Sequence, residues 1–179
     1  MNEQNKISLD LPYPPAKADG YNLYFASLLT NDFAGPVSEF SAISDYTFQS
    51  FVAGNQQVAS LVAGIARIEM QHLQLIGQLI VSLGGNPRFA VQSGCKTNFW
   101  NGRLTNYCTM LRDFLHKDIA NERAAIENYR RRLEQIADSG VHAVLERIIL
   151  DEEHHIVLYG QMLAELSAEN GCGTQQNAN

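Results

Sequence analysis

Hydrophobic residues recur with the period of an α-helix along four long stretches, which are separated by clusters of Gly, Pro and Asn. The pattern predicts helices over about residues 21–52, 57–83, 104–137 and 141–169. We expect the first helix to kink or restart at Gly35-Pro36, because proline is tolerated best in the first turn of a helix. No stretch shows a β-strand pattern.

The connections between these helices predict how they pack. Short turns near Gly54 and Asp138 make the first two helices and the last two antiparallel neighbours. The long aperiodic stretch after Gly84 must travel the length of the bundle. We therefore predict an all-α, four-helix bundle of two antiparallel hairpins joined by a long crossover over residues 21–169. Residues 1–20, rich in proline, should form an irregular arm, and residues 170–179 a polar, disordered tail.

Composition and charge narrow the functional classes. Of 179 residues, 45% are hydrophobic and 18% charged, which is typical of a globular domain. The net charge of −6 argues against nucleic-acid or anionic-membrane partners, since both need an excess of cations. No apolar run is long enough to span a membrane, and the chain start lacks the apolar stretch of a signal peptide. A cytoplasmic location is the expectation.

Isolated cysteines and a run of arginines carry little functional signal. Cys95, Cys108 and Cys172 are far apart, so they build neither a disulfide framework nor a zinc or rubredoxin-type site. Isolated cysteines are usually buried and inert, although the sequence leaves a redox role open. Arg130, Arg131 and Arg132 fan out around a helix and predict a solvated face.

Two E-x-x-H spacings mark the candidate chemistry. Glu69 precedes His72, and Glu152 precedes His155. Residues three apart lie side by side on a helix, so each pair could hold one metal ion. A single such spacing arises easily by chance, and its weight depends on the residues around it.

The surrounding sequence is a repeat. Thirty residues before each of these glutamates stands another, Glu39 or Glu122. Both open an octad of the form E-x-x-A-I-x-x-Y, which ends at Tyr46 or Tyr129. The two halves of the chain match at a constant offset of 83 residues. The pattern indicates an internal duplication of a helical hairpin.

The turn positions place the repeated residues at one height. In each half the turn lies midway between the two glutamates, and residues equidistant from the turn of an antiparallel hairpin lie level. Four carboxylates and two imidazoles should therefore converge inside the bundle. Buried carboxylates repel one another, and two divalent cations would cancel their charge. The mixed oxygen and nitrogen donors suit iron or manganese.

With these residues, the sequence resembles the ferritin-like superfamily of dimetal-carboxylate proteins over about residues 33–167, nearest to the rubrerythrin and bacterioferritin groups. The resemblance implies two divalent transition metal ions per chain. It implies that Glu69 and Glu152 bridge the two ions. Glu39 and Glu122 would bind as terminal carboxylates, and His72 and His155 would each hold one ion. It also implies that Tyr46 and Tyr129, each on the face of its own helix's glutamate, support a carboxylate, and that Asp151 lies behind the ligands.

The sequence also departs from these relatives. Asp151 has Ile68 as its counterpart in the first half, so the two metal positions are expected to differ. Ala125 stands where rubrerythrins carry a further ligand glutamate, and the cysteines for a rubredoxin-like site are missing. Only a short stretch remains where cage-forming ferritins have a fifth helix, which favours a homodimer over a 24-subunit store.

The resemblance implies a redox protein, with iron as the first choice of metal, that reduces peroxide or dioxygen with electrons from a separate donor. Three alternatives stay open. One is manganese catalase-like disproportionation of peroxide, because the ligand types do not separate iron from manganese. The second is iron oxidation and handling. The third is a structural bundle whose metal only cross-links the helices.

Overall fold

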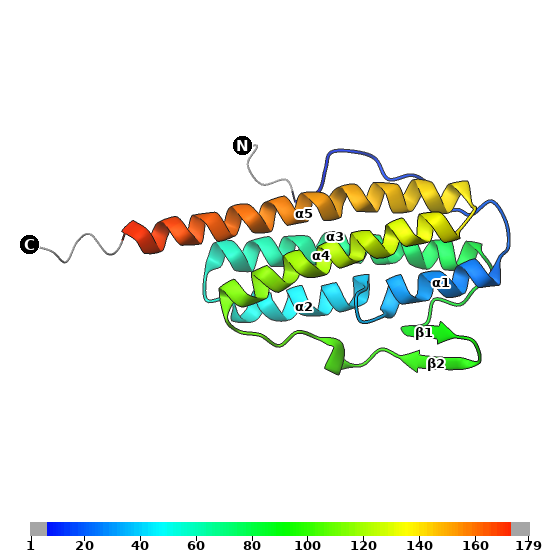
Figure 1. Cartoon of the computed structure of the whole chain (residues 1–179), viewed down its shortest axis with the longest axis horizontal. Helices are drawn as coiled ribbons and strands as arrows, with labels where there is room; N and C mark the ends of the chain where they lie inside the picture. The colour runs from blue at the N-terminus through cyan, green and yellow to red at the C-terminus, as the bar shows by residue number, and fades with distance from the viewer. Residues whose placement is uncertain (1–6, 173–179) are drawn as a thin grey trace, which may run out of the picture.

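Five helices form the body of the computed structural model, which describes residues 7–172, with side chains up to residue 168. They are α1 (Leu23–Ala34), α2 (Glu39–Val52), α3 (Gln56–Ser82), α4 (Leu111–Gln135) and α5 (Ser139–Cys172). α1 and α2 follow one another along the same edge and together make the first helix of a four-helix bundle (Figure 1). The predicted fold class, including the restart at Gly35-Pro36, is confirmed.

Local sequence sets the helix ends that matter for the site. The Ser38 side chain accepts a hydrogen bond from the Ser41 amide and caps α2, so Glu39 is the first residue of that helix. Gly54 takes a left-handed φ of 64° in the turn before α3, and Asn55 caps α3. At the other turn, the Asp138 carboxylate accepts from the Val141 amide at 3.0 Å. α2 packs on α3 and α4 on α5, as the short turns predict.

The crossover differs from the prediction. It holds a small antiparallel hairpin, β1 (Ala90–Ser93) and β2 (Lys96–Phe99), and a 3-10 turn over Gly102–Leu104. α4 consequently begins at Leu111 rather than near residue 104. Strands of four residues are too short to show a clear alternation. The hairpin lies against α1, where Phe89, the residue just before β1, stacks on Phe33 with the ring centres 5.4 Å apart.

Two further expectations are wrong. Arg132 is buried rather than solvated, because its guanidinium pairs with the buried Asp32 carboxylate at 2.7 Å. Of the cysteines, Cys95 is exposed at the β-hairpin and Cys108 is half-buried, so neither is a buried core residue. The side chain of Cys172 and the end of the predicted tail, residues 173–179, lie outside the described residues.

The hydrophobic core is divided in two along the bundle. One cluster gathers α1, the second half of α3 and the first half of α5 around Leu29, Ile76 and Leu145. The other gathers the first half of α3, the start of α4 and the later part of α5 around Ile65 and Phe114. The predicted metal ligands occur in the sequence between the residues of these clusters, so apolar side chains seal the site from both ends.

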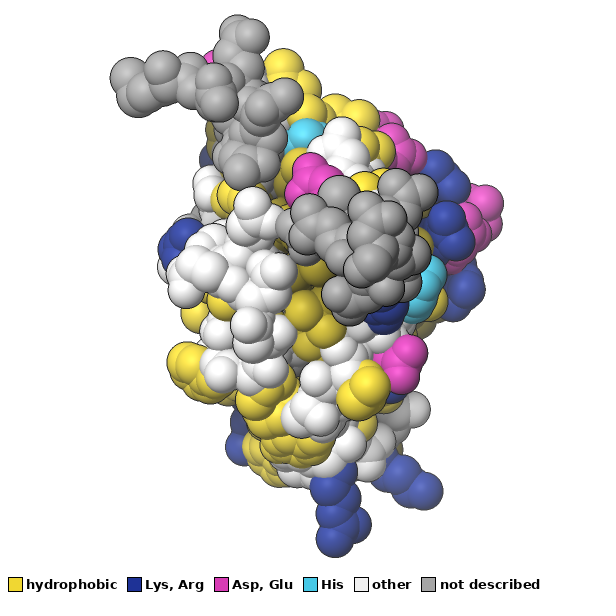
Figure 2. Space-filling view, turned by 90° about the vertical axis from the view of Figure 1, so that its left-hand side faces the viewer, with side chains coloured by type: hydrophobic (Ala, Val, Ile, Leu, Met, Phe, Trp, Pro, Cys, Tyr) yellow, Lys and Arg dark blue, Asp and Glu magenta, His cyan; other side chains and the backbone are white. Residues whose placement is uncertain are grey.

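Among the described residues, none of the helices combines the length and apolar character needed to cross a membrane. The bundle end where α2 turns into α3 presents apolar and uncharged polar side chains next to one another, with Lys and Arg mainly at its edges (Figure 2). Phe51, Tyr107 and Met110 are among the large apolar side chains exposed on the molecule.

Candidate metal centre

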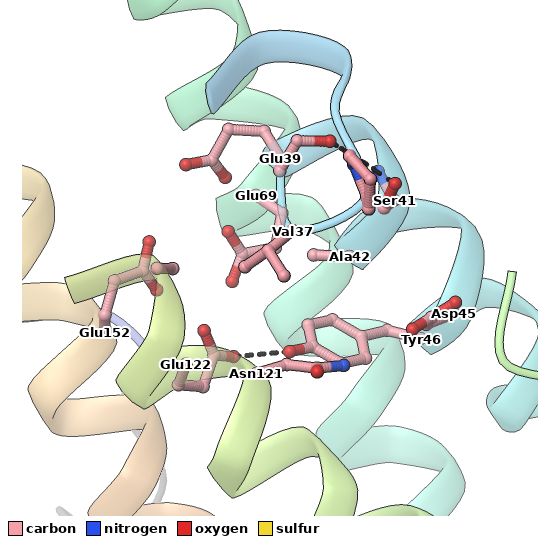
Figure 3. Close-up of a pocket in the computed structure, with 13 residues that line it drawn as sticks. Val37, Glu39, Ser41, Ala42, Asp45, Tyr46, Glu69, Asn121, Glu122 and Glu152 are labelled. Atoms are coloured by element: carbon pink, nitrogen blue, oxygen red, sulfur yellow. Dashed lines mark hydrogen bonds between the residues drawn. The ribbon is translucent and has the colours of Figure 1, made fainter. Parts of the chain in front are cut away.

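All six predicted ligand residues converge in the middle of the bundle. Glu39 comes from α2 and Glu122 from α4, while α3 supplies Glu69 with His72 and α5 supplies Glu152 with His155. All six side chains are buried, and the largest exposed fraction, 3%, belongs to Glu122. Figure 3 shows the four carboxylates turned toward a common centre. The structure therefore brings together every residue that the repeat singles out.

The ligand atoms form two overlapping groups. One contains Glu39, Glu69, His72 and Glu152, and the other contains Glu69, Glu122, Glu152 and His155, with the atoms of each group within 4.8 Å of one another. Glu69 and Glu152 belong to both groups. This overlap is the geometry expected of two ions that share two bridging carboxylates.

Both imidazoles face the shared carboxylates through the same nitrogen. His72 Nδ1 lies 3.2 Å from Glu69 Oε2 and 3.2 Å from Glu152 Oε1. His155 Nδ1 lies 2.9 Å from Glu152 Oε2 and 3.1 Å from Glu69 Oε1. The two halves of the site thus repeat each other, as the duplication predicts.

The buried carboxylates of the site favour the binding of cations. Burial raises the pKa of Glu39 and of Glu122 well above the ordinary value, and the neighbouring carboxylates raise both further. Burial lowers the pKa of His155, but Glu152 and Glu69 outweigh it and raise that pKa to about 10. Protons therefore compensate the carboxylates, and two divalent ions would take their place. Four carboxylates with two imidazoles fit iron or manganese better than the all-oxygen sites of calcium or magnesium.

Each tyrosine of the repeat supports a carboxylate of the other hairpin. Tyr46 Oη donates to Glu122 Oε1 at 2.6 Å, which is drawn as a dashed line between the two labelled residues in Figure 3, and Tyr129 Oη donates to Glu39. The sequence predicted that each tyrosine supports a carboxylate but did not say which one. Seven residues advance about 10 Å along a helix, so the level partner lies across the bundle.

Comparison with known proteins agrees with this site. Residues 34–163, well over half of the chain, match the Rubrerythrin family. The chain belongs to the rubrerythrin family. A probable manganese catalase from Clostridium acetobutylicum is 25% identical over 171 residues, which cover 86% of this chain and 76% of that protein.

Solved structures share the fold of this rubrerythrin-family chain. A manganese catalase from Anabaena PCC7120 matches with a TM-score of 0.75 at 23% identity, over 93% of this chain and 80% of that one. A bacterioferritin from Desulfovibrio desulfuricans, described with a diiron site, matches with a TM-score of 0.61 at 23% identity, over 81% of each chain. Ferritin-like dimetal proteins are therefore its structural neighbours.

A pocket reaches the carboxylate side of the site. Its lining includes all four glutamates, together with Val37, Ala42 and Tyr46 from the α1–α2 edge and Asn121 and Ala125 of α4. Figure 3 shows the four glutamates, Val37, Ala42 and Asn121 around this space. Neither histidine belongs to the lining. The cavity of about 20 Å³ holds roughly one molecule the size of water. Ala125, at the position where the resemblance would place a further ligand glutamate, is part of this lining.

The histidine side of the site is unequal in the two halves. His72 Nε2 lies 3.1 Å from Asp151 Oδ2, whereas His155 Nε2 has no hydrogen-bond partner among the described residues. Asp151 also lies 2.8 Å from an Arg147 nitrogen and accepts a hydrogen bond from Tyr13. The sequence indicated a role for Asp151 but not for Tyr13 or Arg147. The spacing of four residues between Arg147 and Asp151 was a usable signal, while nothing in the sequence placed Tyr13 there.

A buried polar cluster adjoins Tyr46 and was also missed. Gln49 Nε2 donates to Asp118 Oδ1 at 2.9 Å, and the rings of Tyr46 and Tyr159 lie 5.9 Å apart. Burial raises the pKa of Asp118 to about 8, which outweighs the hydrogen bond from Gln49. Asp118 is thus held mainly in its neutral form at neutral pH.

Proposed function

We propose that this chain is a dimetal oxidoreductase that reduces peroxide, or alternatively dioxygen, at a di-iron site bound by the six converging residues. The observation that carries the proposal is the pair of overlapping ligand groups that share Glu69 and Glu152. Membership of the rubrerythrin family and the fold shared with a diiron bacterioferritin support it.

The six candidate ligands would have three different roles. Glu69 and Glu152 would bridge the ions, Glu39 and Glu122 would each bind one, and His72 and His155 would complete the two positions. When bound, two iron ions supply a pair of electrons that a small oxidant can take up together. The chain orients the terminal carboxylates through Tyr129 and Tyr46, and the small pocket admits an oxidant while excluding larger molecules.

We further propose a cytoplasmic homodimer that receives electrons from a separate protein or small reductant. The chain has three cysteines, too few for a four-cysteine iron site of its own. Light scattering of the purified protein tests the dimer, and a monomer or a large cage would contradict it.

The second candidate is manganese catalase activity. The sequence similarity to a probable manganese catalase covers 86% of this chain, and the fold is shared with a manganese catalase. The donor set accommodates manganese equally well. The two candidates differ in whether peroxide loss needs an external reductant.

Metal loading followed by a peroxide assay separates the candidates. Apo protein is reconstituted with iron or with manganese, and peroxide consumption, oxygen release and reductant oxidation are followed together. The proposal predicts that the iron form consumes peroxide beyond the first molecule per site only with reductant and releases no oxygen. Oxygen release from the manganese form, one molecule for every two of peroxide, would establish the catalase instead.

Two controls define the remaining outcomes. The variant Glu69→Ala should lose the activity of either form, while Glu127→Ala, which alters an exposed glutamate, should keep it. Uptake of many irons per chain would indicate iron handling. Bound metal without any peroxide consumption would leave a structural role and overturn the proposal.

A further inference from the structure

The N-terminal strap, residues 7–19, is fastened to the bundle over α3 and α5. Figure 1 shows this segment running alongside α5. The Ala18 amide donates to Ser82 Oγ at 2.9 Å, and the Asp19 amide donates to Asp138 at 2.8 Å. At the other end, Ile7 packs so closely on Gly64 that a Cβ there would lie 3.0 Å from it. The strap is therefore a docked part of the fold.

Arg147 holds the middle of the strap in place. Its guanidinium donates to the carbonyl oxygens of Leu9 at 3.2 Å and Leu11 at 3.1 Å. The same guanidinium lies 4.3 Å from the centre of the Tyr13 ring and 2.8 Å from Asp151 Oδ2. One buried arginine thus ties the strap to the carboxylate behind the site.

The strap places Tyr13 beside Asp151 and His72, at one of the two metal positions. Tyr13 Oη donates to Asp151 Oδ2 and lies 3.3 Å from His72 Nε2. The Leu9 amide occupies the other carboxylate oxygen, Asp151 Oδ1, at 3.1 Å. With both oxygens of Asp151 engaged, the carboxylate is fixed, and it fixes the His72 ring with Nδ1 turned to the shared glutamates.

The second half of the repeat lacks this support. At the offset of 83 residues, Gly64 stands in place of Arg147 and Ile68 in place of Asp151. His155 Nε2 accordingly has no hydrogen-bond partner among the described residues, although the ring is fully buried. A ligand ring without a second partner loses more freedom when it binds a metal.

We propose that the strap makes the two metal positions unequal, with Tyr13 as a positioning residue that, through Asp151 and His72, makes the Glu39–His72 position the tighter one. The inference rests on the proposed binding of two ions. It assigns an order of filling: the first ion enters beside His72 and the second beside His155. Hydrogen-bonded partners behind a metal ligand typically change affinity by about 10- to 100-fold, which sets the scale of the difference.

Titration of apo protein with Mn²⁺ tests the order, with free Mn²⁺ measured by its electron paramagnetic resonance signal. The wild-type chain should bind two ions with affinities that differ by at least about tenfold. Tyr13→Phe should weaken the tighter class several-fold and leave the weaker class unchanged. Ile68→Asp, which places a carboxylate in the position equivalent to Asp151, should strengthen the weaker class and bring the two affinities together.

A matched control separates positioning from general loosening of the strap. Leu11→Ala alters a side chain that is 48% exposed and keeps the carbonyl oxygen that Arg147 binds, so both affinities should stay unchanged. Two equal affinities in the wild type, or an equal loss in both classes with Tyr13→Phe, would overturn the inference while the site itself stands. Failure to bind any Mn²⁺ or Fe²⁺ would instead overturn the proposed function.

Discussion

Removing single carboxylates should remove different numbers of metal ions, because the carboxylates do not belong to the same number of ligand groups. Glu69 belongs to both groups, and Glu122 to only one. Glu127, one and a half turns further along α4, is 66% exposed and pairs with Arg130 at the surface. From a starting content of about two ions per chain, Glu69→Ala should retain none, Glu122→Ala about one, and Glu127→Ala about two.

The choice of replacement isolates the ligand role of Glu122. Alanine would leave Tyr46 Oη buried without its acceptor, at a cost of about 1–3 kcal/mol. Glu122→Gln keeps an oxygen for Tyr46 but gives up the negative charge, so metal loss in this variant reports on charge and coordination rather than on lost support. It also removes a buried carboxyl group whose pKa is raised, so the apo fold should not be weakened.

The assay is metal content per chain by mass spectrometry after identical reconstitution, with circular dichroism to confirm that each variant is helical. Equal metal content in the Glu122 and Glu127 variants would refute the assignment of Glu122 to the inner face of α4. Loss of both ions from Glu122→Gln, matching Glu69→Ala, would refute the sharing of the two central glutamates.

Three further predictions concern stability. The pKa of Asp118 is raised to about 8, so the folded protein is most stable when this carboxyl group is protonated, and stability is lost as the pH rises from the ordinary pKa through 8. Asp118→Asn should therefore have a higher melting temperature than the wild type at pH 8, and the difference should shrink toward pH 4. Chelation of bound metal should lower the melting temperature, since free metal at about 100 times Kd stabilises the native state by about 2.7 kcal/mol, and an unchanged melting curve would contradict this. Gly140→Ala places a Cβ against the Lys17 carbonyl oxygen, so trypsin should cut at Lys17 faster than in the wild type, while equal cleavage would show that the strap tolerates the methyl group.

The convergence of the six candidate ligands was predictable because the chain carries their pattern twice. A single E-x-x-H pair has little weight, but Glu39 and Glu122 at matched distances from two turns fix the height and face of every ligand. Helix periodicity and the positions of glycine and proline then determine the bundle. These signals are local or repeated, so they survive without any knowledge of the tertiary contacts.

The features that were missed depend on contacts between distant parts of the chain. Tyr13 reaches Asp151 across 138 residues of sequence, and Arg132 reaches Asp32 across 100. No period or motif marks such pairs, and an arginine run on a helix looks solvated until its partner is placed. For the same reason the sequence did not show which carboxylate each tyrosine supports, because the partners lie across the bundle.

Metal content of the wild-type protein tests most directly whether the six converging residues bind two metal ions. The protein should be expressed with iron and manganese both available, purified without chelators, and analysed for all transition metals. We expect about two ions per chain, with iron as the metal. Absence of any bound transition metal, even after anaerobic reconstitution with Fe²⁺ and with Mn²⁺, would mean that the six converging residues are a duplicated structural feature and not a metal centre.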